Sequence, residues 1–393
     1  MFESLEALPS DAILRLIEEH ADDPRSEKVD LGVGVYRSEA GDTPILKSVK
    51  AAERRIIETQ KTKAYLGSGG DPEFNALVQR LTFGDDAPAA RITTLQTPGG
   101  SGALRVAAGL VLRARGEATV WHSDPTWANH VPLLGGAGLE MRPYPYYDAD
   151  NCVVLYEQMI DKLRTLPQGD IVLLHGSCHN PTGMDLSREQ WQEVADVIAS
   201  RGLLPYVDLA YQGFAAGLDE DAYGVRLLAG KVPEMIVATS CSKNFGLYRD
   251  RVGSLSVLSA DAATADIVRS QAHNLVRTIY SMPPDHGAAI VRHILTDDTL
   301  RSQWLDELAQ MRERLQAMRA SLCAALGDVA PDADFSHVER ANGMFCFLGL
   351  SEAQVERLKA ERGVYMVGSS RINVAGITPG NVRYLAESIA SVL

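Results

Sequence analysis

Short apolar runs alternate with amphipathic segments between residues 91 and 259 of this chain. The runs are rich in Val, Leu and Ile with little polar alternation, which is typical of strands buried on both faces of a parallel sheet. They predict strands at residues 118–122, 170–175, 203–209, 235–239 and 252–258. Because the segments between such strands have one apolar face, we expect helices on both sides of a largely parallel sheet, the architecture of an α/β unit.

Capping residues mark the helix ends in this unit. The segment S-R-E-Q-W-Q-E-V-A-D-V-I-A-S-R-G begins at Ser187, a favoured N-cap residue, and stops at Gly202. Another helix is predicted from Gly102 to Arg115, after the strand-like run R-I-T-T-L-Q and before Gly116. Both helices therefore connect predicted strands.

The C-terminal third has a different pattern, with a long helix leading into a second domain. Its apolar stripe recurs at helical spacing before Gly327 and consists of Leu305, Leu308, Met311, Leu315, Met318 and Leu322. A capping box at Ser351 starts a further helix that ends at Gly363, and a last helix begins near residues 378–379. Strand-like runs at residues 343–348 and 364–367 complete a small α+β unit. The pattern of residues 10–20 also predicts a helix, capped by Ser10. This N-terminal segment folds either alone or onto the small α+β unit.

Composition narrows the class of protein. At 393 residues the chain is long enough for two domains of about 100 to 200 residues each. A formal charge of −13 argues against a nucleic-acid or anionic-membrane surface, since both require clustered cations. The five cysteines are scattered, the N-terminal residues M-F-E-S-L-E-A-L-P-S do not resemble a signal peptide, and no run approaches the roughly 18 apolar residues of a membrane span. We expect a soluble, cytoplasmic protein.

The most informative segment for chemistry is E-M-I-V-A-T-S-C-S-K-N-F-G-L-Y-R-D-R-V-G, in which a buried strand leads into a loop of small residues that ends at Lys243. The hydroxyls of Ser240 and Ser242 precede the lysine, and the cations Arg249 and Arg251 follow it, a setting suited to a phosphate. Neighbouring cations also make a lysine easier to deprotonate and hence more nucleophilic. Taken alone, the segment would equally describe a solvated lysine in a serine-rich turn.

Other polar motifs follow the predicted strands. The turn T-P-G-G-S-G-A-L-R opens a helix, where free backbone N–H groups bind phosphate, although it lacks the full dinucleotide fingerprint. Trp127 follows the next strand, Asn180 lies in a C-H-N-P-T-G turn where a cis proline bond would aim its amide inward, and Asp208 ends a strand with Tyr211 close behind. Because ligands of such sheets bind outside the carboxyl ends of the strands, we expect these residues to converge on Lys243.

A metal site is the weaker interpretation of one of these motifs. His175, Cys178 and His179 are close together in the sequence, but a structural zinc site requires four ligands, and no second cluster supplies the rest. We therefore expect no metal at this position.

Taken in order, the motifs G-G-S-G-A-L, D-P-T-W-A-N-H, C-H-N-P-T-G, V-D-L-A-Y-Q-G-F, S-C-S-K-N-F-G-L-Y-R-D-R-V-G and S-R-I-N-V-A-G resemble those of class I aminotransferases of the aspartate and aromatic amino acid type. The resemblance extends from G-V-G-V-Y-R near residue 32 to the C-terminus. It implies a pyridoxal-phosphate-dependent transferase of fold type I that works as a homodimer with shared active sites. It also implies an N-terminal arm at residues 1–10, a small domain at 11–43 and 311–393, and a large cofactor-binding domain at 44–310.

The resemblance also assigns roles around the cofactor. Lys243 would bind pyridoxal phosphate covalently, and Asp208 would keep the pyridine nitrogen protonated so that the ring accepts electrons. Tyr211 and Asn180 would hydrogen-bond the phenolic oxygen, and Trp127 would stack on the ring. The phosphate would be held by Gly100, Ser101, Ser240, Ser242 and Arg251, with Tyr65 reaching over from the other subunit.

Substrate residues follow from the same resemblance. Arg371 would grip the substrate α-carboxylate with its forked guanidinium, near Gly34, Trp127 and Asn180. Arg277 would come from the second subunit and bind a dicarboxylate side chain.

The implied reaction moves an amino group from aromatic amino acids, aspartate or both to 2-oxoglutarate by a ping-pong mechanism. Apolar neighbours of Arg277, namely Ile279 and Met282, favour aromatic donors alongside dicarboxylates, and Ser101 also departs from the threonine common in strict aspartate enzymes. A strict aspartate aminotransferase is the alternative.

Other enzyme classes fit the sequence less well. A nicotinamide-dependent oxidoreductase would use the glycine-rich turn for pyrophosphate, but the fingerprint is incomplete. A lyase or decarboxylase that uses the same cofactor stays open because the chemistry branches after the first proton loss, although the two arginines favour transamination. A regulator built on this fold would need an added DNA-binding module, which is not visible in the sequence.

Overall fold

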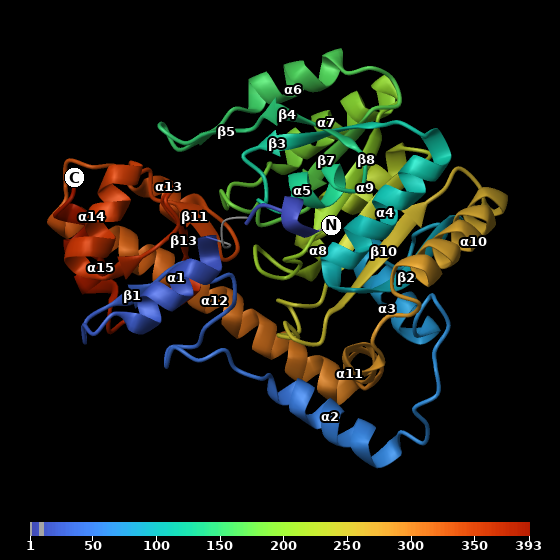
Figure 1. Cartoon of the computed structure of the whole chain (residues 1–393), viewed down its shortest axis with the longest axis horizontal. Coiled ribbons are helices and arrows are strands. Elements are labelled where there is room, and N and C mark those ends of the chain that lie inside the picture. Colours follow the sequence, from blue (N-terminus) through green and yellow to red (C-terminus); the bar gives the residue numbers. More distant parts are fainter. Residues whose placement is uncertain (1, 8–11) are drawn as a thin grey trace.

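The computed structural model describes residues 2–7 and 12–393 and contains a central sheet covered by helices, with a smaller unit at the C-terminal end (Figure 1). The strands are β1 (Val29–Asp30), β2 (Ile92–Pro98), β3 (Thr119–Asp124), β4 (Glu140–Pro145), β5 (Tyr147–Asp148), β6 (Val153–Val154), β7 (Ile171–His175), β8 (Leu204–Leu209), β9 (Met235–Ser240), β10 (Val252–Leu258), β11 (Phe345–Phe347), β12 (Val364–Tyr365) and β13 (Arg371–Asn373).

Helices form much of the remaining chain. They are α1 (Ala12–Asp22), α2 (Lys47–Thr59), α3 (Pro72–Phe83), α4 (Gly99–Arg115), α5 (His130–Gly135), α6 (Tyr156–Thr165), α7 (Arg188–Arg201), α8 (Leu218–Asp221), α9 (Tyr223–Lys231), α10 (Ala262–Ile279), α11 (Asp285–Thr296), α12 (Asp298–Val329), α13 (Ser336–Arg340), α14 (Glu352–Arg362) and α15 (Val382–Ala390). The N-cap predicted at Ser10 lies outside the described residues.

The central sheet has seven strands in the order β2-β10-β9-β8-β7-β3-β4. Only β10 runs antiparallel to its neighbours, so the predicted, largely parallel α/β sheet is confirmed, and each strand predicted between residues 118 and 258 forms. The edge strand β4 was not predicted. Its sequence, E-M-R-P-Y-P, is mostly exposed or half-buried and carries two prolines, so it gives no apolar run.

Alternate residues of the inner strands pack on opposite faces of this sheet. Leu173 and Tyr206 lie in a core formed with α4, α5 and α10, whereas Val172 and Val207 lie in a core formed with α6, α7 and α9. Because successive strand residues point to opposite faces, a strand buried on both sides must be apolar at nearly every position. This explains the continuous apolar runs in the sequence.

Several helix ends differ from the predicted ones. The predicted ends of α7 are confirmed, with a capping box between Ser187 and Gln190 and a left-handed Gly202. Helix α4 begins at Gly99 rather than Gly102, so the glycine-rich turn forms its first turn. Helix α15 begins at Val382, later than predicted, because residues 378–381 form a hydrogen-bonded turn instead.

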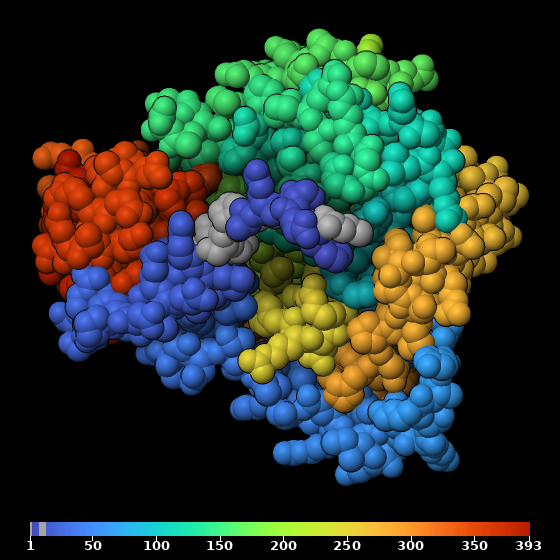
Figure 2. Space-filling view, viewed as in Figure 1, coloured from blue at the N-terminus to red at the C-terminus, as the bar shows by residue number. Residues whose placement is uncertain are grey.

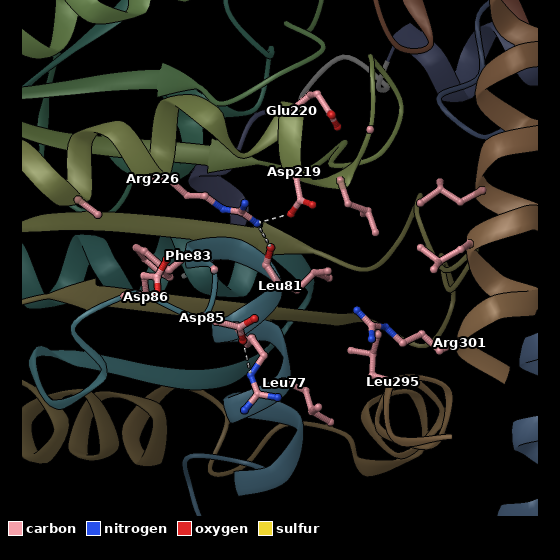
Figure 3. Close-up of a pocket in the computed structure, with 18 of the residues that line it drawn as sticks. Leu77, Leu81, Phe83, Asp85, Asp86, Asp219, Glu220, Arg226, Leu295 and Arg301 are labelled. Atoms are coloured by element: carbon pink, nitrogen blue, oxygen red, sulfur yellow. Dashed lines mark hydrogen bonds and ion pairs between the residues drawn. The ribbon is translucent and has the colours of Figure 1, made fainter. Parts of the chain in front are cut away.

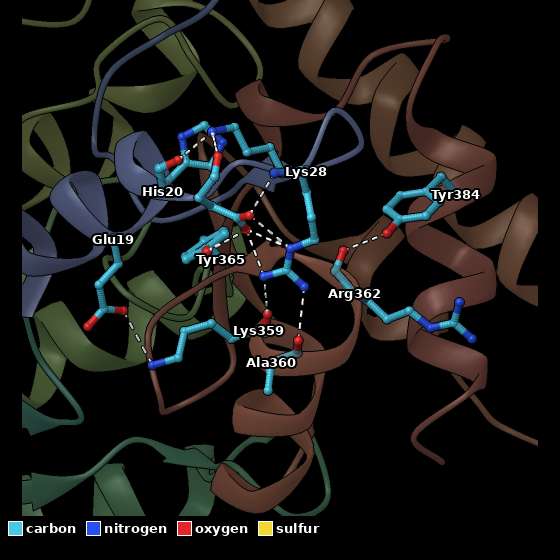
Figure 4. Close-up of polar contacts among 10 residues, drawn as sticks. Glu19, His20, Lys28, Lys359, Ala360, Arg362, Tyr365 and Tyr384 are labelled. Carbon is cyan, nitrogen blue, oxygen red and sulfur yellow. Dashed lines mark hydrogen bonds and ion pairs between the residues drawn. The ribbon is translucent and has the colours of Figure 1, made fainter.

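The small unit combines both ends of the chain. Strand β1 pairs with β12 in parallel, and β11 pairs with β13 antiparallel. The carboxylate of Asp23 accepts hydrogen bonds from Arg25 and from the hydroxyl of Tyr365, and the Arg25 guanidinium donates to the carbonyls of Lys359 and Ala360 at the end of α14 (Figure 4). The N-terminal helical segment therefore folds onto the C-terminal unit, which resolves the alternative left open by the sequence.

Helix α12 joins the two units. It runs from beside α11 to α15 (Figure 1) and continues through Gly327 to Val329, where the sequence had predicted an earlier end. The predicted domain boundary at residue 310 falls inside this continuous helix, and the division into domains stays a prediction.

A pair of glycine-to-alanine substitutions tests the packing of the sheet against α4. A Cβ at Gly253 of β10 would lie 2.6 Å from the carbonyl carbon of Gly99, whereas a Cβ at Gly327 of α12 meets no atom within 4 Å. We expect Gly253→Ala to lower the free energy of unfolding by about 1 to 3 kcal/mol through overpacking. Gly327→Ala should raise it by roughly 0.5 to 1 kcal/mol, because alanine favours the helix. Urea unfolding measures both, and equal effects of the two substitutions would contradict this account.

Candidate active site

The predicted site residues meet at one edge of the sheet. Strand β2 is parallel to β9, because both are antiparallel to β10, so β2, β3, β7, β8 and β9 all end at this edge. A cavity of about 190 Å³ lies there. The predicted residues that line it are Gly34, Gly100, Ser101, Trp127, Asn180, Asp208, Tyr211, Ser240, Ser242, Lys243, Arg251 and Arg371.

Two predicted residues do not reach this cavity. Tyr65 is 93% exposed and lines a separate hollow with Arg269 and His273. Arg277 is exposed near the end of α10. The sequence resemblance assigned both side chains to the site of a second subunit, and that assignment stays a prediction.

A buried carboxylate lies at the end of β8. Asp208 accepts a hydrogen bond from His130, with 2.9 Å between Oδ2 and Nε2, and Nδ1 of His130 lies 2.8 Å from the hydroxyl of Thr126. Burial acts to raise the pKa of Asp208, but the His130 hydrogen bond and the nearby charges, including that of Lys243, together hold the pKa below its ordinary value. Asp208 is therefore ionised at neutral pH.

His130 was missed by the sequence analysis. It follows Trp127 in the motif D-P-T-W-A-N-H and begins α5, and its side chain is completely buried. The available signal was the buried strand carboxylate, which needs a donor, but the sequence alone does not say which of several histidines supplies it.

The neighbouring histidines also have partners within the protein. Burial lowers the pKa of His175 to about 3, so this ring is neutral. His179 hydrogen-bonds Ser123 and Thr182 through its two ring nitrogens. Within the described part of the chain, no group of three or more His, Cys, Asp or Glu side chains is arranged to hold a metal ion.

Lys243 lies in the loop after β9, with Nζ 4.7 Å from the centre of the Tyr211 ring. Burial lowers the pKa of Lys243 to about 8, Asp208 opposes this change, and Arg251 adds to it. The sequence analysis attributed the easier deprotonation of Lys243 to the neighbouring cations Arg249 and Arg251. That attribution was incomplete, because burial is the larger cause and Arg249 is exposed and does not line the cavity.

At the other side of the cavity, Arg251 lies beside the N-terminus of α4. A Cβ at Gly99 would lie 2.6 Å from a guanidinium nitrogen of Arg251, and one at Gly100 would lie 3.4 Å from Cβ of Ser240. Glycine at position 99 therefore lets the guanidinium approach the helix start closely, whereas a Cβ at Gly100 would make an ordinary contact. A helix N-terminus, a guanidinium and two serine hydroxyls form a favourable set for a phosphate.

Asn180 indicates that the cavity is built for a polar ligand. The Asn180–Pro181 peptide bond is cis, as the sequence suggested. The amide oxygen of Asn180 is buried without a hydrogen-bond partner among the described residues, and so is the hydroxyl of Ser177. Buried polar atoms are normally paired, so these groups fit a bound molecule that carries hydrogen-bonding atoms beside its phosphate.

Arg371 lies on β13 at the wall formed by the small unit. Its Nη2 donates to the carbonyl of Gly32 at 3.1 Å, and its guanidinium carbon lies 4.5 Å from the centre of the Phe345 ring. Phe345 also lines the cavity, but the sequence analysis took it only as part of a strand-like run.

In Figure 2, residues 2–7 (dark blue) lie on the front face, between the small unit (red) and the teal part of the unit that contains the central sheet.

A larger hollow of about 1060 Å³ lies away from these residues, between α3, α8 and the start of α12 (Figure 3). Its charged side chains are partly neutralised by one another, as in the Arg226–Asp219 pair at 2.8 Å and the Arg80–Asp85 pair at 3.1 Å. It contains none of the predicted site residues.

Comparison with known proteins matches this geometry. The family described as "Aminotransferase class I and II" matches residues 26–389. The chain is 48% identical to the aspartate aminotransferase of Escherichia coli, covering 100% of both, and 47% identical to the aromatic-amino-acid aminotransferase of Pseudomonas aeruginosa, covering 100% of the chain and 98% of the relative. The crystal structure of an aromatic-amino-acid aminotransferase from Burkholderia pseudomallei, covalently bound to pyridoxal phosphate, superimposes with a TM-score of 0.98 at 42% identity, covering 100% and 99% of the two chains.

Among the described residues, none of the helices is long and apolar enough to cross a membrane.

The lowered pKa of Lys243 gives a testable difference in reactivity. Only the neutral amine is nucleophilic, so in cofactor-free protein the acetylation rate of Lys243 should rise through a pH of about 8 and then level off. Lys359 is the internal control, because burial acts to lower its pKa but hydrogen bonds with Glu356 and Glu19 raise it above 10.5, and its rate should still increase at higher pH. Mass spectrometry of acetic-anhydride-labelled peptides measures both rates, and parallel pH profiles for the two lysines would contradict the assignment.

Proposed function

Because this chain belongs to the aminotransferase class I and II family and is a pyridoxal-phosphate-dependent transaminase, we propose that it transfers the amino group of aromatic amino acids and of aspartate to 2-oxoglutarate. The observation that carries this proposal is the cavity in which Lys243 and Asp208 lie together with the cations Arg251 and Arg371. A reactive amine, a buried carboxylate and two separate anion binders are the parts that the reaction requires.

The cavity suits the cofactor at each end. Arg251, the start of α4 and the hydroxyls of Ser240 and Ser242 hold the phosphate, with Gly100 and Ser101. When bound, pyridoxal phosphate supplies an electron sink for bonds broken at the substrate Cα and carries the amino group between two half-reactions. Asp208, kept ionised by His130, holds a proton on the ring nitrogen. Asn180 and Tyr211 would bind the phenolic oxygen, and Trp127 would cover the ring.

Lys243 and Arg371 act on the substrate. The guanidinium of Arg371 binds the α-carboxylate in two-pronged fashion and so orients the Cα–H bond toward Lys243. The neutral amine of Lys243 would take the proton from Cα, and the bound cofactor would supply the carbon that accepts it. In the cofactor-free protein, burial lowers the pKa of Lys243 to about 8, which favours the neutral, reactive form of the amine. Phe345 supports the Arg371 guanidinium from one face.

The complete site requires a second copy of the chain. Tyr65 and Arg277 are exposed and lie outside their own cavity, which fits residues that serve the partner's site in a homodimer. The five cysteines are free, which fits a cytoplasmic location.

The substrate range follows from the surroundings of Arg277. This cation attracts the second carboxylate of aspartate, glutamate and 2-oxoglutarate, while the apolar neighbours Ile279 and Met282 offer a surface for aromatic rings. Relatives named for aspartate and for aromatic amino acids are almost equally similar to the chain, so overall identity does not separate the two. The side chains around Arg277 favour dual specificity over a strict aspartate enzyme.

A half-reaction tests the mechanism. With glutamate alone, the purified enzyme should release one 2-oxoglutarate per site and change its cofactor absorption, because the amino group stays on the enzyme. Lys243→Ala should bind pyridoxal phosphate without a covalent bond and lose more than about 10²-fold in rate, because the proton carrier is gone. Lys359→Ala is the matched surface control and should remain active. Release of 2-oxoglutarate only in the presence of a second keto acid would refute the ping-pong order, and near-normal turnover of Lys243→Ala would remove Lys243 from this role.

Substitution of Arg277 tests the substrate range. Arg277→Leu should lower kcat/KM for aspartate by about 10- to 100-fold, the loss of one charge-assisted hydrogen-bonded contact, and leave phenylalanine nearly unaffected. Arg301→Leu, which changes an exposed arginine of the larger hollow, is the control. Single-turnover rates of the first half-reaction, with each amino acid alone, measure each effect, because 2-oxoglutarate would itself use Arg277. Inactivity of the wild type toward phenylalanine would leave the strict aspartate aminotransferase as the function.

A further inference from the structure

Residues 31–35 form a buried or half-buried coil segment that follows β1. Gly34 of this segment lines the cavity at the edge of the central sheet. A coil in such a place must find hydrogen-bond donors for its carbonyls outside regular secondary structure. Strand β13 supplies them. The backbone N–H of Asn373 donates to the carbonyl of Leu31 at 2.7 Å, and Arg371 donates to that of Gly32 at 3.1 Å.

The side chain of Asn373 holds the rest of the segment. Its amide nitrogen donates to the carbonyl of Val33 and, at 2.8 Å, to that of Val35, while its oxygen accepts from the N–H of Ala375 at 2.9 Å. Asn373 is 2% exposed. Both amide hydrogens therefore bind the segment that carries Gly34.

Asn373 and Arg371 act from the same strand. Side chains alternate along a strand, so these two residues share one side of β13, while Ile372 between them is completely buried in the core. The carbonyl of Gly32, which accepts from Arg371, lies between the carbonyls of Leu31 and Val33, which Asn373 binds. Any movement of the segment away from Asn373 therefore shifts the acceptor of the Arg371 guanidinium.

We infer that Asn373 is a positioning residue for substrate binding: by holding residues 31–35 against β13 it fixes the Gly32 carbonyl that orients Arg371 and keeps Gly34 at the cavity wall. This inference rests on the proposed function, in which Arg371 binds the substrate carboxylate. Asparagine suits the task because one planar amide offers two donors to two carbonyls. Aspartate would place oxygen against oxygen, and alanine would leave both carbonyls unpaired.

The ends of the segment have anchors of their own. The N–H of Leu31 donates to the carbonyl of Tyr365 at 2.8 Å, and the N–H of Tyr36 donates to the hydroxyl of Tyr248 at 2.8 Å. Removing the Asn373 amide therefore loosens the middle of the segment while its ends stay attached. We expect such a variant to fold.

The experiment compares Asn373→Ala and Asn373→Asp with Asn381→Ala in the pyridoxal-phosphate-loaded enzyme. Asn381 is the matched control, because its amide also donates to a backbone carbonyl, that of Gly376, and accepts from Thr378 N–H, but its side-chain hydrogen bonds do not go to residues 31–35. Both Asn373 variants should raise KM for the amino acid and for 2-oxoglutarate by about 10- to 100-fold, since a displaced binding group costs that much, with a smaller change in kcat. The cofactor absorption should stay at full intensity, and Asn381→Ala should keep the wild-type KM.

Hydrogen exchange provides a readout that does not depend on activity. In the Asn373 variants, amides in residues 32–35, between the two anchored ends, should exchange faster than in the wild type, whereas Asn381→Ala should leave their rates unchanged. Faster exchange with unchanged KM overturns the positioning role, and so does an equal rise in KM in the Asn381 control. If Asn373→Ala does not fold, Asn373→Ser, which keeps one donor, carries the same comparison. A wild type that fails to react with glutamate would refute the proposed function instead, while the exchange comparison would still test the contact.

Discussion

The hydrogen bond between His130 and Asp208 is the interaction on which the site depends. A carboxylate at the buried end of β8 would be unstable without a donor, and the proposed function requires that carboxylate to be ionised so that it can keep a bound pyridine nitrogen protonated. His130 meets both needs, since its other ring nitrogen lies 2.8 Å from the Thr126 hydroxyl and the ring is fixed in place. The negative charge of Asp208 opposes the lowering of the pKa of Lys243, and the charge of Lys243 in turn lowers the pKa of Asp208.

Sequence patterns predicted the central sheet well because its strands are buried on both faces and read as apolar runs. They also located the motifs at the carboxyl edge, since a parallel sheet brings such ends together. The edge strand β4 was not predicted, because its exposure and its two prolines leave no apolar run in the sequence. His130 and Phe345 were not predicted as site residues for another reason. Their roles depend on which side chain meets which across the fold, and local patterns do not contain that information.

The arginines show a second limit of sequence reasoning. Arg371 lies at the cavity of its own chain, held by Gly32 and resting on Phe345, whereas Arg277 is exposed on α10. Nothing in the local sequence of either residue states this difference. The placement of Arg371 follows from the small unit, which turns β13 toward the sheet edge. In the proposed function, a site divided between two units in this way would bind the cofactor with one and the substrate carboxylate with the other.

The pairing of β1 with β12 has a consequence for the making of the protein. The guanidinium of Arg25 binds the carbonyl of Ala360, a separation of 335 positions along the chain. During synthesis the N-terminal segment therefore lacks these partners until residues 359–365 have left the ribosome, while the central sheet can already assemble.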